Sequence, residues 1–202
     1  MGRMANVPDH RGFDEMYVGV PPWDIGTAQP EVVRIAEAGG FKGAVIDVGC
    51  GTGENALELS ARGSPVVGVD ASPRAIEKAR AKALERGSSA EFLVADAFSL
   101  DALGRRFDTA LDCGVFHVFE DRERPAYVAS LASVLGPRGV LHLLCFSDRQ
   151  PGDMGPRRVS QQEIRDSFAE GWDVVEIVAT TFVANLPGGG AQAWRATIAR
   201  LG

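Results

Sequence analysis

The chain has 202 residues, 45% hydrophobic and 24% charged, a composition typical of a globular protein with a full core, and we expect one domain spanning residues 1–202. A formal net charge of -6 and a pI near 5.1 argue against nucleic acid or an anionic membrane as partner, since either would favour a basic surface. Three cysteines without paired short spacings, and the lack of a signal sequence or membrane span, predict a cytoplasmic protein that binds a small molecule.

The N-terminal segment contains two predicted helices joined by a proline-rich loop. The first is expected between residues 8 and 19, with Tyr17 on its apolar side. Trp23 follows in the loop, where so large an apolar side chain has to cover either the core or a ligand. The second helix is predicted over 31–38, with a proline just before it and two glycines after it. We expect residues 1–40 to form a cap or lid.

A strand, a glycine-rich turn and a helix follow. The apolar run 44–48 predicts a strand buried on both faces, and a helix begins near Ala56. The glycines between them permit turn dihedrals that other residues avoid, and they let a ligand lie against the main chain. A dinucleotide-binding turn requires G-x-G-x-x-G, but Glu54 stands where its third glycine should be. A carboxylate there would face a phosphate unfavourably.

The turn Asp47-x-Gly49-x-Gly51-x-Gly53 resembles the first motif of the class I S-adenosylmethionine-dependent methyltransferases. The ligand of that family carries an amino-acid end and an adenosine but no phosphate. The resemblance implies S-adenosyl-L-methionine as cofactor and S-adenosyl-L-homocysteine as product. The cofactor contacts expected in this chain are Trp23, Gln29, Asp47, Gly49, Gly51, Thr52, Gly53, Asn55, Asp70, Ala71, Asp96, Ala97, Asp112 and Cys113. A glycine-rich turn without a ligand is the alternative.

The second predicted strand, 65–70, ends in an acidic residue. Asp70 stands about twenty residues beyond the first glycine, where such a side chain can accept hydrogen bonds from both ribose hydroxyls. A helix N-cap is the other role open to it. Ser72 and Pro73, however, already supply a cap and a first-turn proline for a helix over 74–86. We therefore predict that Asp70 binds the ribose.

The third predicted strand, 91–95, leads into Asp96 and Ala97. The resemblance implies that the Asp96 carboxylate accepts a hydrogen bond from the exocyclic amine of adenine. The amide of Ala97 would donate to a ring nitrogen. A turn-forming aspartate ahead of Phe98 is the alternative for Asp96.

The fourth predicted strand, 107–112, is followed by a loop with a histidine. Ligands of doubly wound sheets lie outside the carboxyl ends of the strands, so this loop should face the reactive centre. His117 is predicted to remove a proton from the acceptor or only to orient it, with a core histidine as the alternative. The residues predicted to line the acceptor site are Tyr17, Trp23, Phe116, His117 and Phe119.

A narrower resemblance appears in this half of the chain. The segments 112–119, 141–148 and 155–159 are similar to the small mycobacterial-type heterocyclic toxin (quinolone) methyltransferases. The elements around Trp23 and Gln29 are shared with them and, more loosely, with thiopurine and tellurite methyltransferases. This resemblance implies methyl transfer to oxygen or nitrogen of a small aromatic heterocycle such as a hydroxyquinolone.

Several alternatives for the function stay open from the sequence. Within the methyltransferases, a thiol or tellurite acceptor is the second substrate class. Outside them, a Rossmann oxidoreductase or a module that only binds a nucleoside would use a similar turn. The sequence also leaves open whether the protein is a monomer or a homodimer.

The C-terminal part completes the predicted sheet. A helix over 122–135 and a strand over 139–146 precede a long loop, 147–159, that should form one wall of the substrate mouth. A capping box at 160–163 opens a further helix, and two alternating segments after it predict a hairpin. The resulting fold class is α/β, a doubly wound, seven-stranded, mostly parallel sheet with the last strand antiparallel. No zinc-ligand spacing occurs, so no metal site is predicted.

Overall fold

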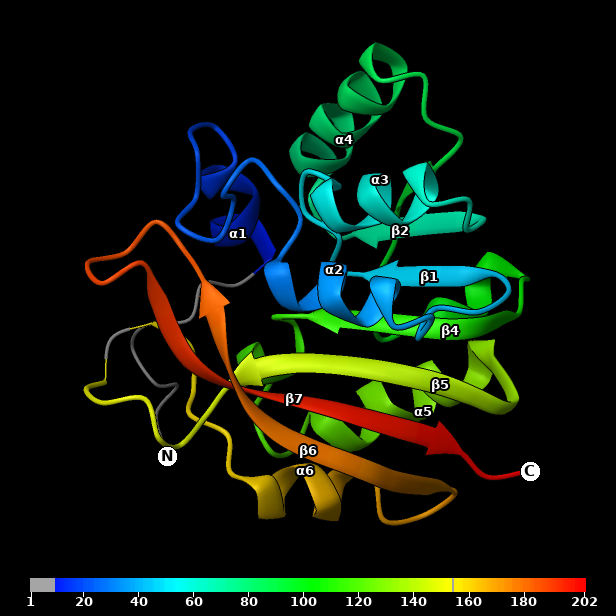
Figure 1. Ribbon diagram of the computed structural model, residues 1–202, viewed down its shortest axis with the longest axis vertical. Coiled ribbons are helices and arrows are strands. Elements are labelled where there is room, and N and C mark those ends of the chain that lie inside the picture. Colours follow the sequence, from blue (N-terminus) through cyan, green and yellow to red (C-terminus); the bar gives the residue numbers. More distant parts are fainter. Residues whose placement is uncertain (1–9, 154) are drawn as a thin grey trace.

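One mixed sheet organises the molecule, and the computed structural model describes residues 10–153 and 155–202 of the chain. Within them a 7-stranded sheet has the order β3-β2-β1-β4-β5-β7-β6 (Figure 1). The strands are β1 Val45–Val48, β2 Val66–Asp70, β3 Glu91–Val94, β4 Phe107–Cys113, β5 Leu135–Phe146, β6 Trp172–Val183 and β7 Gly190–Arg200. Strand β7 runs antiparallel to both of its neighbours, β5 and β6, while the other pairings are parallel. The predicted fold class is confirmed.

Helices cover both faces of this sheet (Figure 1). They are α1 His10–Met16, α2 Pro30–Glu37, α3 Glu54–Ala61, α4 Pro73–Glu85, α5 Arg124–Val134 and α6 Gln161–Ser167, with short 3-10 turns η1 Leu100–Leu103 and η2 Phe116–Val118. Side chains of α2, α3 and α4 share one apolar cluster with β1 and β2. Side chains of α5 and α6 share the other with β4, β5 and β7. Each face of the sheet thus has its own core.

Strand β1 lies at the centre because its residues are apolar on both faces. Val45, Ile46 and Val48 have no exposed surface, as expected of a strand between two parallel neighbours. The fourth residue, Asp47, is fully buried as well. A buried carboxylate destabilises the folded protein unless a partner offsets its desolvation. The partner that we predict for Asp47 is described with the functional site below.

The predicted helix caps are confirmed, and one strand boundary is wrong. The Ser72 hydroxyl accepts from the amide of Ala75 at 3.1 Å and caps α4, and Ser160 and Glu163 form a capping box on α6. Strand β5 begins at Leu135 rather than at 139. Leu135 pairs with Phe107 before an irregularity in the β4–β5 ladder, which local patterning cannot reveal.

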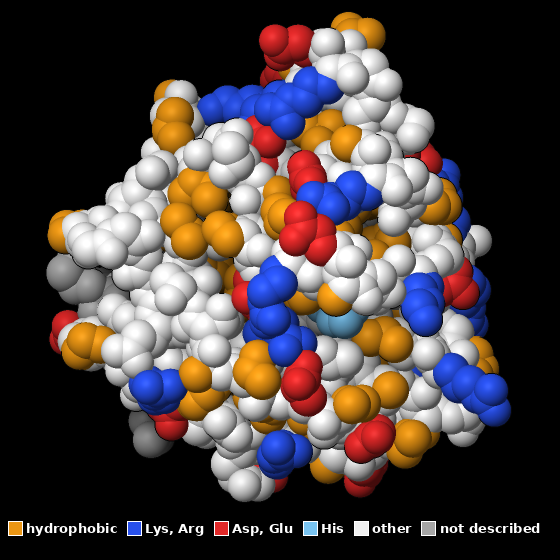
Figure 2. All heavy atoms as spheres, in the orientation of Figure 1, with side chains coloured by type: hydrophobic (Ala, Val, Ile, Leu, Met, Phe, Trp, Pro, Cys, Tyr) orange, Lys and Arg blue, Asp and Glu red, His pale blue; other side chains and the backbone are white. Residues whose placement is uncertain are grey.

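The carboxyl ends of β1 to β5 meet at one edge of the sheet, the left edge in Figure 1, beside α1. Side chains of both charge signs are interspersed over the face in Figure 2, without a large field of one sign. None of the helices in the described ranges has the length and apolarity needed to cross a membrane. Because the carboxyl ends of β1 to β5 lie together, the loops after these strands converge at a single place where a ligand can bind.

Candidate active site

The turn between β1 and α3 depends on its glycines. Gly49, Gly51 and Gly53 have φ of 69°, 54° and 86°, in the left-handed region that favours glycine. A β-carbon on Gly49 would stand 2.1 Å from Cγ2 of Val115, and one on Gly51 would stand 2.9 Å from the Tyr17 hydroxyl. Neighbouring loops therefore approach the bare main chain of this turn closely, as a ligand also can.

The charge at the start of α3 is unsuited to a phosphate. Oxygens of Glu54 lie 2.7 Å from Nζ of Lys82 and 2.8 Å from Nη1 of Arg86. The carboxylate thus already occupies the helix N-terminus, where a dinucleotide would place its pyrophosphate. This geometry supports a cofactor without a phosphate.

The Asp70 carboxylate is held in place by main-chain amides. Its Oδ2 accepts from Gly51 N at 2.9 Å and its Oδ1 from Ser72 N at 2.8 Å. Each oxygen keeps a further lone pair. Two fixed acceptors at the end of a strand suit the two adjacent hydroxyls of a ribose, so ribose binding remains our prediction for Asp70. The neighbouring Ala71 is exposed.

Asp47 is a buried acid at the site. Neither of its oxygens has a hydrogen-bond partner among the described residues, although the side chain is fully buried. Burial, reinforced by the charges of Asp70 and Asp112, raises the pKa of Asp47 to about 8, and the nearby amide of Ala56 only partly offsets the rise. An ammonium group, such as the amino-acid end of S-adenosylmethionine carries, would satisfy this carboxylate.

The pKa of Asp47 leads to a pH prediction. An aspartate has a pKa of about 3.9 in the unfolded chain, so between that value and about 8 the native state holds the extra proton. The contribution of Asp47 to the free energy of unfolding is therefore full below about pH 4 and is lost as pH rises through about 8. We expect Asp47→Asn to flatten the fall in Tm between about pH 4 and about pH 8, the range in which the native state holds the proton and the unfolded chain does not.

Cofactor binding should also displace this proton. At about pH 7 calorimetry in two buffers of different ionisation enthalpy should show proton release when S-adenosylhomocysteine binds, because its ammonium favours the ionised Asp47. The Asp47→Asn variant should release fewer protons. Equal release by the two proteins would show that Asp47 does not meet the ammonium.

The geometry of Asp96 is compatible with both roles considered for it. Its Oδ1 accepts from Phe98 N at 2.9 Å, which makes the expected turn, while the side chain stays exposed. The turn leaves lone pairs on the carboxylate for an adenine amine. Ala97 is half-buried beside it. Adenine contact by both residues stays a prediction.

The predicted cap is bound to the site at several points; its residues 1–9 lie outside the described part of the chain. Nε1 of Trp23 donates to the Tyr17 hydroxyl at 3.0 Å, and this hydroxyl lies close to Gly51. The hydroxyl of Thr52 donates to Asp24 at 2.9 Å. It also accepts from Lys82, so this side chain joins the cap to the turn rather than pointing to a ligand.

Two further cofactor candidates also hold the cap. The side-chain amide of Gln29 donates to Val183 O at 2.7 Å and accepts from Val183 N at 3.0 Å, which extends the end of β6. Oδ1 of Asn55 accepts from Gln29 N at 2.9 Å. Sequence reasoning missed Asn185, whose amide nitrogens bond to the carbonyls of Pro22 and Asp24. The hairpin β6–β7 therefore anchors the cap beside the glycine turn.

Asp112 does not offer its side chain to a ligand. It is fully buried, and it accepts from the amides of Val115 and Phe116 and from the Tyr127 hydroxyl at 2.7 Å. Burial raises its pKa to about 6 against these bonds. The carboxylate braces the loop after β4, contrary to the cofactor contact expected of it. Cys113, beside it, is half-buried at the end of the strand.

The structure contradicts two of the predicted acceptor contacts. Phe116 has no exposed surface, because its ring packs on Phe168 and under the guanidinium of Arg124, 4.5 Å from the ring centroid. Phe119 is buried against Phe98 and Tyr127, with ring centroids 4.7 and 4.8 Å away. Phe116, in the 3-10 turn η2, and Phe119, directly after it, both pack in the core, whereas His117, also buried at 4% exposure, contacts other aromatic rings.

The aromatic neighbours of His117 were not predicted. The ring of Phe146, at the end of β5, lies 4.9 Å from the imidazole, and that of Phe182, near the end of β6, lies 6.0 Å from it. Trp23 and Cys113 pack against the same cluster. The position of Phe146 as the last residue of a predicted parallel strand was the available sequence signal for it. These side chains form an apolar wall at the edge of the sheet.

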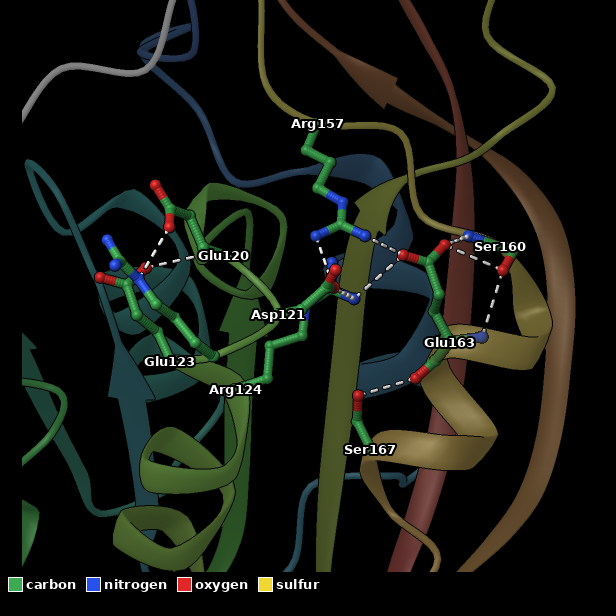
Figure 3. Close-up of polar contacts among 9 residues, drawn as sticks. Glu120, Asp121, Glu123, Arg124, Arg157, Ser160, Glu163 and Ser167 are labelled. Carbon is green, nitrogen blue, oxygen red and sulfur yellow. Dashed lines mark hydrogen bonds and ion pairs between the residues drawn. The ribbon is translucent and has the colours of Figure 1, made fainter. Parts of the chain in front are cut away.

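A network of charges fixes the loop after β5 (Figure 3). Arg157 lies between Asp121 and Glu163, and Arg124 contacts the same two carboxylates from α5. Arg158 donates to main-chain carbonyls of its own loop, among them Gln150 O at 3.2 Å. Both loop arginines are thus bound within the protein.

A doubly wound sheet with a glycine turn after β1 and acidic side chains in β1 and at the end of β2 has the architecture of the Rossmann-like S-adenosylmethionine-dependent methyltransferases. The family model described as "Methyltransferase domain" matches residues 45–139. A 2-heptyl-1-hydroxyquinolin-4(1H)-one methyltransferase of Mycobacteroides abscessus is 37% identical over 184 residues, which cover 88% of this chain and 81% of that protein. The chain therefore belongs to the methyltransferase family, and its cofactor is S-adenosylmethionine.

Two further relatives bear on the acceptor. A probable thiol methyltransferase 2 of Arabidopsis thaliana is 29% identical over 181 residues, covering 87% of this chain and 80% of that protein. A solved structure named "Conversion of a Disulfide Bond into a Thioacetal Group during Echinomycin Biosynthesis" superposes with a TM-score of 0.87 at 37% identity, covering 96% of this chain and 93% of the other. The names of these two relatives both refer to sulfur chemistry, whereas the Mycobacteroides relative is named for a hydroxyquinolone.

Proposed function

We propose that this methyltransferase acts on a hydroxyl oxygen, or a nitrogen, of a small aromatic heterocycle such as a hydroxyquinolone. The observation that carries the proposal is the apolar wall of Trp23, Phe146 and Phe182 around His117 at the carboxyl ends of the strands. Aromatic rings of this kind favour a flat apolar ligand. The hydroxyquinolone named for the Mycobacteroides relative has that shape.

The roles we propose for the other residues follow from their geometry. S-adenosylmethionine supplies an electrophilic methyl group on a sulfonium. Asp47 would hold its ammonium, Asp70 its ribose and Asp96 its adenine, while Tyr17 and Trp23 cover the glycine turn and exclude water. Methyl transfer of this kind needs mainly alignment in a dry pocket, so fixing both partners supplies most of the rate.

A thiol acceptor is the second candidate, favoured by the name of the Arabidopsis relative. The same apolar wall would accommodate an aromatic thiol, since sulfur is soft and weakly hydrated. A tellurite acceptor has less support from the site, because it has no flat apolar surface to pack against the aromatic walls. We further propose a cytoplasmic protein, a monomer or a homodimer, without a nucleic-acid partner.

Incubation of the purified protein with S-adenosylmethionine and each acceptor tests the proposal. We expect a 1-hydroxyquinolin-4-one to gain one methyl group by mass spectrometry, faster than an aromatic thiol or tellurite. Binding of S-adenosylhomocysteine should raise Tm, whereas NAD and NADP should not. Faster methylation of the thiol would instead favour the second candidate. A rise in Tm without methylation of any aromatic acceptor would overturn the proposed substrate class.

A further inference from the structure

The hydrogen bond at Nδ1 of His117 fixes the tautomer of the ring. Nδ1 lies 3.0 Å from the main-chain nitrogen of Phe146, both atoms being buried. A main-chain N–H can only donate, so Nδ1 accepts with its lone pair and the proton of the neutral imidazole is on Nε2. The other ring nitrogen, Nε2, is therefore a donor.

The surroundings of the ring keep it neutral. The charged groups that face it are Arg158, from the loop after β5, and Arg124, from α5; β5 and β6 contribute only aromatic rings. Burial and these two positive charges lower the pKa of His117 to about 3, while the main chain of Gly114 acts weakly in the opposite direction. A histidine in this setting does not take up a proton at neutral pH.

Other bases are lacking nearby among the described residues. The Asp112 carboxylate accepts several hydrogen bonds from the protein, and Asp47 is fully buried within β1. Burial raises the pKa of the Cys113 thiol and of the Tyr17 hydroxyl, so neither ionises readily to serve as a base. An acceptor that arrives with its proton would have no group to receive it.

We infer that the enzyme takes its acceptor as an anion and that His117 orients it through a hydrogen bond from Nε2, without removing a proton. Nε2 lies 3.5 Å from where a β-carbon on Gly114 would stand, so it is beside the residue that follows β4. Gly114 has a φ of 93°, and a β-carbon there would stand 3.1 Å from the ring of Phe182 and would crowd it. The inference rests on the proposed function and narrows it.

The chemistry balances without a base in the protein. A lone pair of the anionic acceptor forms the new bond to the methyl carbon while the carbon–sulfur pair returns to sulfur. The sulfonium becomes a neutral thioether, the acceptor becomes a neutral methyl product, and no proton moves. The substrate class is therefore an acidic heteroaromatic N-hydroxyl or hydroxyl, or an ionised aromatic thiol. Weakly acidic phenols are poor substrates at neutral pH.

The first test compares acceptors of different acidity. We expect kcat/KM to rise with pH to a plateau for a 1-hydroxyquinolin-4-one, an aromatic thiol and a naphthol, with each midpoint at the pKa of that acceptor. Comparison of these acceptors also distinguishes an oxygen nucleophile from a sulfur nucleophile. A single midpoint shared by all three acceptors would indicate a titrating base in the enzyme and overturn the inference.

The second test uses two substitutions of His117. Glutamine can accept from Phe146 N and donate to the acceptor but cannot act as a base, whereas alanine can do neither. We expect His117→Gln to stay within about threefold of the wild type and His117→Ala to lose about 10- to 100-fold in kcat/KM, the size of one hydrogen bond to a charged group. Equal losses in the two variants would overturn the donor role, and Tm measurements check that both fold.

A third measurement needs no turnover. Two-dimensional ¹H–¹⁵N NMR of the wild-type protein, with His117→Gln to assign the signal, should show a neutral ring protonated at Nε2. Calorimetry on the S-adenosylhomocysteine complex should show tighter binding of the 1-hydroxyquinolin-4-one as it ionises. If no acceptor is methylated, the proposed function fails, but the NMR and calorimetric results still test the inference. A ring protonated at Nδ1, or acceptor binding that weakens as the acceptor ionises, would overturn the inference.

Discussion

Replacing Asp70 by asparagine is expected to weaken S-adenosylhomocysteine binding by about 100-fold. The change removes the charge behind two proposed hydrogen bonds to the ribose, and bonds to a charged group contribute about 1.5–3 kcal/mol each. The affinity is measured by calorimetry. Burial raises the pKa of Asp70, so its charge is itself costly in the free protein and the substitution should change Tm much less than affinity.

Asp101→Asn is the matched control for this prediction. Asp101 is exposed on η1, and its main-chain carbonyl accepts from Gly104 N, so the variant removes the same charge away from the site. Its affinity for S-adenosylhomocysteine should equal that of the wild type. If Asp70→Asn binds as tightly as Asp101→Asn, the ribose does not lie at the end of β2.

Gly53→Ala is expected to lower the free energy of unfolding by about 2–5 kcal/mol. Gly53 has a φ of 86°, where a side chain costs about 1–2 kcal/mol. The new methyl carbon would stand 2.7 Å from Cζ of Phe92, a buried ring, and 3.0 Å from Cβ of Ala79. Overpacking of this kind adds about 1–3 kcal/mol. Urea unfolding of the two proteins measures the difference.

Gly63→Ala separates the two contributions. Gly63 follows α3 with a φ of 93°, but a β-carbon there would meet nothing within 4 Å. This variant should lose only the part due to backbone strain, about 1–2 kcal/mol. Equal losses at the two positions would mean that the packing of α4 and β3 against the turn contributes little.

Much of the site was predictable because its signals are local. The glycines at 49, 51 and 53, the aspartate at the end of β2 and the cap at Ser72 each depend on dihedral preferences or strand ends close in sequence. The misassigned rings show the limit of such signals. Phe116 and Phe119 flank His117 in the sequence, yet the 3-10 turn η2 places them in the core.

By itself the sequence determined the strand–turn–helix cradle and the membership of an α/β sheet, because apolar periodicity and turn chemistry act between near neighbours. The cofactor class came from the resemblance of its glycine motif to that of a known family. Only the tertiary structure decided that β7 inserts between β5 and β6, that Gln29 bonds to Val183 154 positions away, and that the amide of Phe146 meets Nδ1 of His117. These contacts depend on long-range packing, which no local pattern encodes. The chemical role of the histidine follows from one of them.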